Sequence, residues 1–130
     1  MKLRELLAQE KMTLSFEVFP PKTDTAFDLV KSAIEEIAAL HPAFMSVTYG
    51  AGGGTSKYTL DIAKEIKMEH GVSTLAHLTC VSSTKETVRA RIAEAQTLSP
   101  YGQTVTLLAA TKTVDAQTIN AAARECGLTH

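Results

Sequence analysis

Along this chain of 130 residues, short apolar runs alternate with segments whose apolar residues recur at helical spacing. This alternation restricts the fold more than any other feature of the sequence. Short apolar runs typical of buried strands occupy residues 13–19, 43–50, 73–81 and 104–110. Each run is followed by a segment whose apolar residues recur at helical spacing. Such repeats predict a parallel sheet, because parallel strands need a long crossover that is usually a helix. The sequence therefore predicts an α/β fold of four consecutive βα units. These units form either a doubly wound open sheet or half of an eight-stranded TIM-like barrel.

The predicted helices have recognisable ends. Asp24 and Asp115 are suitable N-caps, and Gly71 is suited to ending a helix. Ser83 and Glu86 have the spacing of a capping box. The apolar residues expected to face the core from the first two long helices are Phe27, Val30, Ile34, Ile37, Tyr58, Ile62 and Ile66.

The composition is that of an ordinary soluble domain. Thirteen basic and fourteen acidic residues give a net charge of −1, so nothing indicates a nucleic-acid groove or a basic membrane surface. No run is long enough to span a membrane. Cys80 and Cys126 form no CxxC pair and no metal cluster, which favours a reducing, cytoplasmic location. The length predicts a single domain.

The most unusual residue is Glu17, which lies inside the apolar run LSFEVF and before two prolines. In either predicted architecture, ligands bind beyond the carboxyl ends of the strands, and Glu17 lies near such an end. An apolar surrounding favours the protonated form of a carboxyl group, which suits a general acid. An ion pair with Lys22 or Lys112 would explain the residue equally well.

Other polar side chains end the neighbouring strands. Thr48 and Tyr49 end the second predicted strand, where hydroxyl groups can orient a ligand or simply pack. His77 ends the third, although a lone histidine in a strand is more often structural than a ligand. Lys112 ends the fourth, where a desolvated amine could be nucleophilic, although a surface lysine is the commoner case.

A glycine cluster follows the second strand in TYGAGGGTS, residues 48–56. It lacks both the GxGxxG spacing and the GK[ST] of a phosphate-binding loop. A strand that runs through glycines into a helix N-terminus can still offer backbone N–H groups to an anion or a flat ring. The commoner interpretation of such a segment is a flexible turn.

Three segments together resemble a known family: LSFEVFPPKTD, PAFMSVTYGAGGGTS and LAHLTCVSST. Over about residues 1–88 the chain closely resembles the N-terminal part of bacterial methylenetetrahydrofolate reductases. The resemblance implies an eight-stranded βα barrel that carries FAD. It also implies hydride transfer from NAD(P)H to the flavin and then to a folate substrate, 5,10-methylenetetrahydrofolate, giving 5-methyltetrahydrofolate.

The same resemblance implies roles for individual residues. Glu17 matches the general acid that protonates the folate nitrogen, so that the five-membered ring opens to an iminium. Thr48 matches a residue near the nicotinamide and the flavin. Tyr49, Ala51 and His77 match residues that contact the flavin.

The remainder of the chain departs from this family's pattern. Its fourth predicted strand reads VTLLAATKT, and the Arg-Gly-Asp of the reductases occurs nowhere in the sequence. Residues 89–130 instead resemble the start of the pyridoxal-phosphate homeostasis family, in which Lys112 would hold pyridoxal phosphate as a Schiff base. We therefore expect a junction near residues 84–91 and weak or absent reductase turnover. The alternatives are a pyridoxal-phosphate module or an inactive chimeric fragment.

A partial barrel also leaves strand edges unpaired. The edges are expected at residues 13–19 and 104–110, and such edges favour pairing with another chain. The residues expected to fill the barrel interior are Phe16, Val47, Leu78 and Leu107. An uncovered apolar interior is rarely tolerated in a monomer, so the sequence predicts a homodimer or a soluble aggregate rather than a compact monomer. The competing outcome is a small doubly wound sheet with helices on both faces.

Overall fold

The computed structural model describes residues 3–9, 11–23, 26–49, 56–80, 83–97 and 115–126. Contacts divide the chain into two compact units, Met1–Glu94 and Ala95–His130. The first unit holds the sheet and most of the helices, and the second holds the C-terminal helix. The domain boundary expected near residue 88 stays a prediction.

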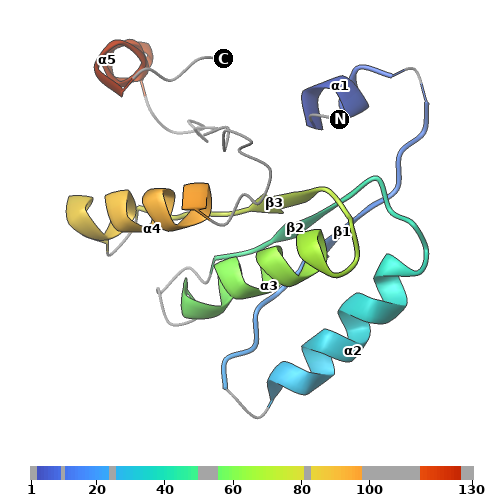
Figure 1. Cartoon of the computed structure of the whole chain (residues 1–130). Helices are drawn as coiled ribbons and strands as arrows, with labels where there is room; N and C mark the ends of the chain where they lie inside the picture. The colour runs from blue at the N-terminus through green and yellow to red at the C-terminus, as the bar shows by residue number, and fades with distance from the viewer. Residues whose placement is uncertain are drawn as a thin grey trace. The chain divides into compact units, whose positions relative to one another are not determined.

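The first unit contains a parallel three-stranded sheet with the order β1-β2-β3 (Figure 1). Its strands are β1 (Ser15–Val18), β2 (Phe44–Val47) and β3 (Thr74–Ala76). Glu17 lies opposite Ser46 in the register of β1 and β2, and Ser46 lies opposite Leu75 in that of β2 and β3. The predicted parallel α/β arrangement is confirmed for these strands. The fourth predicted strand, 104–110, lies outside the described residues, so four βα units are not confirmed.

Five helices are found in the described ranges. They are α1 (Leu3–Leu7), α2 (Phe27–Ala38), α3 (Ser56–Met68), α4 (Lys85–Thr97) and α5 (Ala116–Cys126). Helices α2 and α3 follow β1 and β2 in the chain and supply the crossovers that parallel strands require.

The core lies between the sheet and the helices α2 and α3. Its buried residues are Val18, Ile34, Ala38, Met45, Val47, Ile62, Ile66 and Val72, and the partly buried Phe27, Val30, Ile37 and Tyr58 pack against them. All seven residues predicted from helical spacing are therefore at or around the core. Met45, Val47 and Ile66 are completely buried. Burying each such side chain contributes about 1.5–3 kcal/mol, so this cluster is the main source of stability in the first unit.

Two of the four predicted barrel-interior residues, Phe16 and Val47, lie on the face toward the helices, so that prediction is wrong for them. Leu107 lies outside the described residues, and the placement of Leu78 stays a prediction. Val47 is completely buried in the core, and Phe16 packs against the same core. The reason is strand parity: Phe16 pairs with Met45 and Val18 pairs with Val47, so all four point toward the helices. The alternation in SFEV separates Phe16 and Val18 from Ser15 and Glu17, but in a parallel sheet that can be covered on both sides it does not show which face meets the helices.

The helix ends agree with the sequence in two cases and differ by one residue in a third. Gly71 has φ 67° and follows α3, as predicted for a residue that ends a helix. Asp115 caps α5, accepting a hydrogen bond of 2.9 Å from the Thr118 N–H. The pKa of Asp115 is lowered mainly by a second hydrogen bond, from the Thr118 hydroxyl, and further by this backbone bond. The N-cap of α4 is Thr84 rather than Ser83, because Thr84 Oγ1 accepts the Thr87 N–H at 3.2 Å. Asp24 lies outside the described residues.

Candidate functional site

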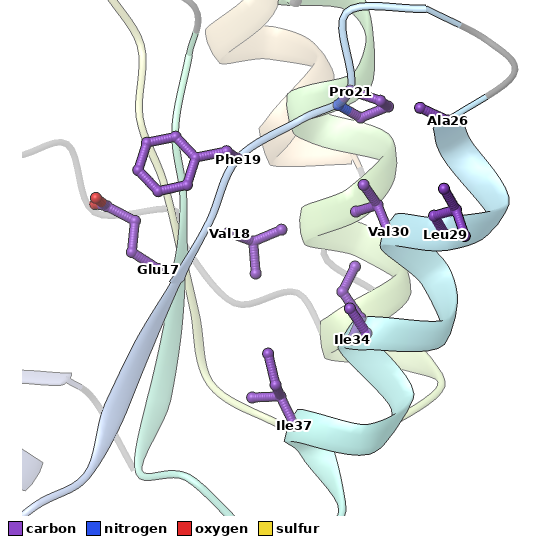
Figure 2. Close-up of a pocket in the computed structure, with 10 residues that line it drawn as sticks. Glu17, Val18, Phe19, Pro21, Ala26, Leu29, Val30, Ile34 and Ile37 are labelled. Atoms are coloured by element: carbon purple, nitrogen blue, oxygen red, sulfur yellow. The ribbon is translucent and has the colours of Figure 1, made fainter.

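Glu17 is held on the face of the sheet that points away from α2. Figure 2 shows Val18 pointing toward Ile34 of α2, while Glu17 and Phe19 lie on the opposite side of β1. This follows from the alternation of side chains along a strand, because burying Val18 in the core directs its neighbours outward. The face that carries Glu17 is called the open face below; on the strands it comprises Ser15, Glu17, Phe44, Ser46 and Leu75.

Two side chains from the other strands approach the carboxylate of Glu17. The Ser46 hydroxyl donates a hydrogen bond to Glu17 Oε1 across 3.3 Å. His77 Nε2, just beyond the end of β3, lies 3.9 Å from the same oxygen. The prediction that Glu17 and His77 occupy the same edge of the sheet is confirmed. Ser46 was not predicted, although a hydroxyl between the buried Met45 and Val47 is itself a signal for a polar partner.

The surroundings of Glu17 are more polar and more open than its sequence context suggests. Its side chain is 47% exposed and that of His77 is 42% exposed. The apolar neighbours Phe16 and Val18 face the helices instead. Among the described residues the basic group that approaches Glu17 is the imidazole of His77, which forms an ion pair only when it is protonated. Lys22 makes no such contact, and Lys112 lies outside the described residues.

The backbone at the end of β2 is fixed by two hydrogen bonds. The Thr48 N–H donates to the Val18 carbonyl at 2.9 Å. The Thr59 hydroxyl of α3 donates to the Thr48 carbonyl at 3.0 Å, and Thr59 is completely buried. The His77 N–H likewise donates to the Val47 carbonyl at 2.9 Å. Thr48 and His77 are thus tied to neighbouring strands at the carboxyl edge of the sheet.

Tyr49 follows Thr48 and interacts with an arginine from α4. The Arg91 guanidinium donates to Glu94 Oε2 at 2.7 Å. This bond is the main cause that raises the pKa of Arg91, and the phenol of Tyr49 raises it further. Tyr49 is therefore near a fixed positive charge. Ala51 and the glycines 52–54 lie outside the described residues, as does Lys112.

An apolar groove of about 330 Å³ lies between β1 and α2 (Figure 2). Its lining residues are Glu17, Val18, Phe19, Pro21, Ala26, Leu29, Val30, Ala33, Ile34 and Ile37. Phe19 and Leu29 are 67% and 74% exposed, so much of this apolar surface remains in contact with water. In the described sheet β1 is an edge strand, and the groove runs beside it.

The described ranges hold no group of three or more His, Cys, Asp or Glu side chains that could bind a metal ion. They also contain no helix that is both long and apolar enough to cross a membrane.

Comparison with known proteins identifies relatives of this chain. The methylenetetrahydrofolate reductase family matches residues 2–102, which extends past the junction expected near residue 88. A 5,10-methylenetetrahydrofolate reductase of Pectobacterium carotovorum is 40% identical over 81 residues, covering 62% of this chain and 27% of the relative. The Escherichia coli K12 protein of the same name is 38% identical over the same length and coverage.

A plant relative extends the match slightly. The "Probable methylenetetrahydrofolate reductase (NADH)" of Oryza sativa is 37% identical over 87 residues, covering 67% of this chain and 15% of the relative. The aligned part of this chain thus spans about a quarter or less of these relatives' length. Binding of pyridoxal phosphate by Lys112 gains no support from these matches and stays a prediction.

Proposed function

The chain belongs to the methylenetetrahydrofolate reductase family, and from that premise we propose that its open face binds FAD and a reduced folate. We propose further that Glu17 donates the proton that opens the folate ring. The observation that carries the proposal is the meeting of Glu17, Ser46 and His77 at the carboxyl edge of a parallel sheet. Ligands of parallel α/β folds bind at this edge.

The proposed proton transfer uses the protonated carboxyl group of Glu17. Its O–H bond breaks and the proton moves to the folate nitrogen N10. The bond between N10 and the bridging methylene carbon breaks, and its electron pair stays on N10. The methylene carbon then forms an iminium with N5. The flavin, when bound, supplies the hydride that reduces this carbon to a methyl group.

The described residues suit a flavin at this edge. His77 has a half-exposed imidazole that can donate to or accept from a polar ring atom. Thr48 lies at the end of β2 with its backbone fixed by Thr59 and Val18, so its position is defined before any ligand binds. Together with Tyr49, and with Ala51 by resemblance, these residues form the proposed flavin-binding set.

The hydride donor and the location are also proposals. Relatives from Oryza sativa and Arabidopsis thaliana carry NADH in their names, which supports a nicotinamide dinucleotide as co-substrate. A cytoplasmic location is proposed from the absence of paired cysteine motifs in the sequence.

Catalytic turnover by this chain alone is expected to be weak. The aligned region spans 27% of the bacterial relatives, and proton transfer coupled to hydride transfer needs groups that are held in precise mutual orientation. We expect FAD to bind with low affinity and NADH–menadione oxidoreductase activity to stay far below that of a complete reductase.

Titration of FAD into the purified chain tests the proposed function. Binding quenches flavin fluorescence, and the variant His77→Ala is expected to weaken it, while Lys31→Ala on α2 serves as a control on the other side of the sheet. Failure of FAD and of 5-methyltetrahydrofolate to bind at millimolar concentration would refute the proposal. A lysine adduct formed with pyridoxal phosphate and fixed by borohydride would favour the alternative that uses Lys112.

The free edge of β1 and the adjoining groove support the predicted homodimer as a second proposal. Phe19 and Leu29 leave apolar surface exposed there, and pairing with a second copy would cover it. Sedimentation measures this directly: we expect a species of twice 14.0 kDa, and Leu29→Gln is expected to shift it toward the monomer. A wild-type chain that sediments only as a monomer would contradict the dimer.

A further inference from the structure

Ser46 is a buried polar residue on the open face, where its partners on the neighbouring strands are Glu17 and Leu75. It occupies the third position of β2, between Met45 and Val47, and only 8% of it is exposed. A buried hydroxyl group needs a hydrogen-bond partner, because leaving it unsatisfied is costly. Its partner is Glu17 Oε1, at 3.3 Å on the neighbouring strand.

The register of the sheet makes this contact a fixed one. Glu17 and Ser46 are directly paired residues of adjacent parallel strands, so their side chains leave the same face side by side. Ser46 has a short side chain on a rigid strand, whereas Glu17 has three rotatable bonds and is half exposed. The hydroxyl of Ser46 is therefore the fixed partner and the carboxylate is the group that it restrains.

The second neighbour of Glu17 does not have the same effect. His77 Nε2 lies 3.9 Å from Oε1, which is beyond hydrogen-bond distance, and its imidazole is itself half exposed. Both neighbours nevertheless approach the same oxygen, Oε1. Neither of these two contacts involves Oε2.

We infer that Ser46 is a positioning residue, which holds Glu17 in one rotamer and leaves Oε2 as the oxygen that delivers the proton. When a carboxyl group is protonated, one oxygen carries the hydrogen and donates, while the other can only accept. Because Oε1 accepts from Ser46, the proton resides on Oε2. This inference rests on the proposed role of Glu17 as the general acid, but the restraint itself can be measured without any ligand.

The restraint is tested by NMR on the full chain. Three-bond couplings between Hα and the two Hβ protons of Glu17 report whether χ1 occupies one staggered rotamer or averages over several. We expect a single rotamer in the wild type and averaged couplings in Ser46→Ala. The matched control Ser46→Thr keeps the hydroxyl in a residue that favours strands, and it is expected to restore the wild-type couplings.

Two results would overturn the inference. One is rotamer averaging of Glu17 in the wild-type chain, and the other is unchanged couplings in Ser46→Ala. If Ser46→Ala does not fold, Ser46→Cys replaces it, because a thiol of similar size is a weak donor and is expected to give intermediate couplings. Wild-type couplings in Ser46→Cys would then count against the inference.

A kinetic readout separates this inference from the proposed function. If the chain opens the folate ring, Ser46→Ala is expected to slow that step between about tenfold and a hundredfold, with the folate KM unchanged. In a Glu17→Gln background the same substitution is expected to have no effect, since Ser46 acts through Glu17. Equal losses in both backgrounds would refute the inference. Absence of ring opening would refute the proposed function and leave the couplings to decide on Ser46.

Discussion

The two faces of the three-stranded sheet are built from alternate residues of the same strands, yet their environments differ strongly. The face toward α2 and α3 carries Val18, Met45 and Val47, which are almost completely buried. The open face carries Glu17, which is half exposed and meets Ser46 and, beyond the strand end, His77. One face supplies stability through packing, and the other places polar groups at an edge where a ligand can reach them. The difference teaches that substitutions on the two faces should change different measurable properties.

The largest expected effect on stability is in the core, where Ile66 of α3 belongs to the buried cluster that includes Val18, Met45 and Val47. Ile66→Ala removes a completely buried side chain from the core and leaves a cavity. Such substitutions cost about 2–5 kcal/mol of unfolding free energy. Urea unfolding followed by far-UV circular dichroism measures the loss, with the volume-conserving Ile66→Leu as control. A loss no larger than that of an exposed substitution would show that the cluster does not provide the stability assigned to it.

A smaller effect is expected at Thr59 of α3, whose hydroxyl holds the backbone at the end of β2. Thr59→Val keeps the shape of a completely buried residue but removes its hydrogen bond to the Thr48 carbonyl. We expect a loss of about 1 kcal/mol in unfolding free energy, measured by the same denaturation. The control Thr59→Ser retains the hydroxyl. Flavin affinity should fall in Thr59→Val more than in Thr59→Ser, and the reverse order would argue against a role for this bond in placing Thr48.

Still smaller is the contribution of the ion pair between α2 and α3. Lys31 Nζ lies 3.5 Å from Glu65 Oε1, and the lysine side chain is 45% exposed. Water and salt screen such a pair, so Lys31→Ala is expected to cost about 0.5 kcal/mol. The cost should vanish in high salt. A salt-independent cost would mean that the aliphatic part of Lys31 contributes through packing instead.

How much of this arrangement could be predicted from the sequence depends on the kind of signal. Helical spacing identified the core residues of α2 and α3, such as Ile34 and Ile62, because a helix must bury one stripe. The strand SFEV alternates polar and apolar residues, so the pattern separates Phe16 and Val18 from Ser15 and Glu17. A parallel sheet can be covered on both sides, however, so the pattern does not show which face meets the helices. Phe16 and Val47 were therefore assigned to the wrong face.

The candidate site likewise combines features that the sequence could predict with features that it could not. The carboxyl-edge rule brought Glu17 and His77 together, because it depends only on the order of parallel strands. Ser46 was missed because its importance depends on register, which pairs it with Glu17 and which no local pattern reveals. The exposure of Glu17 was also misjudged, since sequence neighbours such as Val18 lie on the other side of the strand.

The smallest expected effect on stability belongs to Glu17→Gln, on the open face. Glutamine has nearly the same shape, and its carbonyl oxygen can still accept the hydrogen bond from Ser46. The substitution removes the charge that faces His77, but both side chains are more than 40% exposed and such pairs contribute little. The unfolding free energy should therefore stay within about 0.5 kcal/mol of the wild-type value.

The same substitution should remove the proposed proton donor entirely, because an amide cannot protonate the folate nitrogen. Flavin binding is expected to persist in Glu17→Gln, while any folate ring opening is lost, and the ring-opening assay with and without flavin measures this directly. Ile66→Ala is expected to behave in the opposite way. It should lower the unfolding free energy and weaken flavin binding and ring opening together. If Glu17→Gln were as destabilising as Ile66→Ala, Glu17 would be a structural residue. The contrast between a face that packs against helices and a face that is proposed to carry out chemistry would then not hold for Glu17.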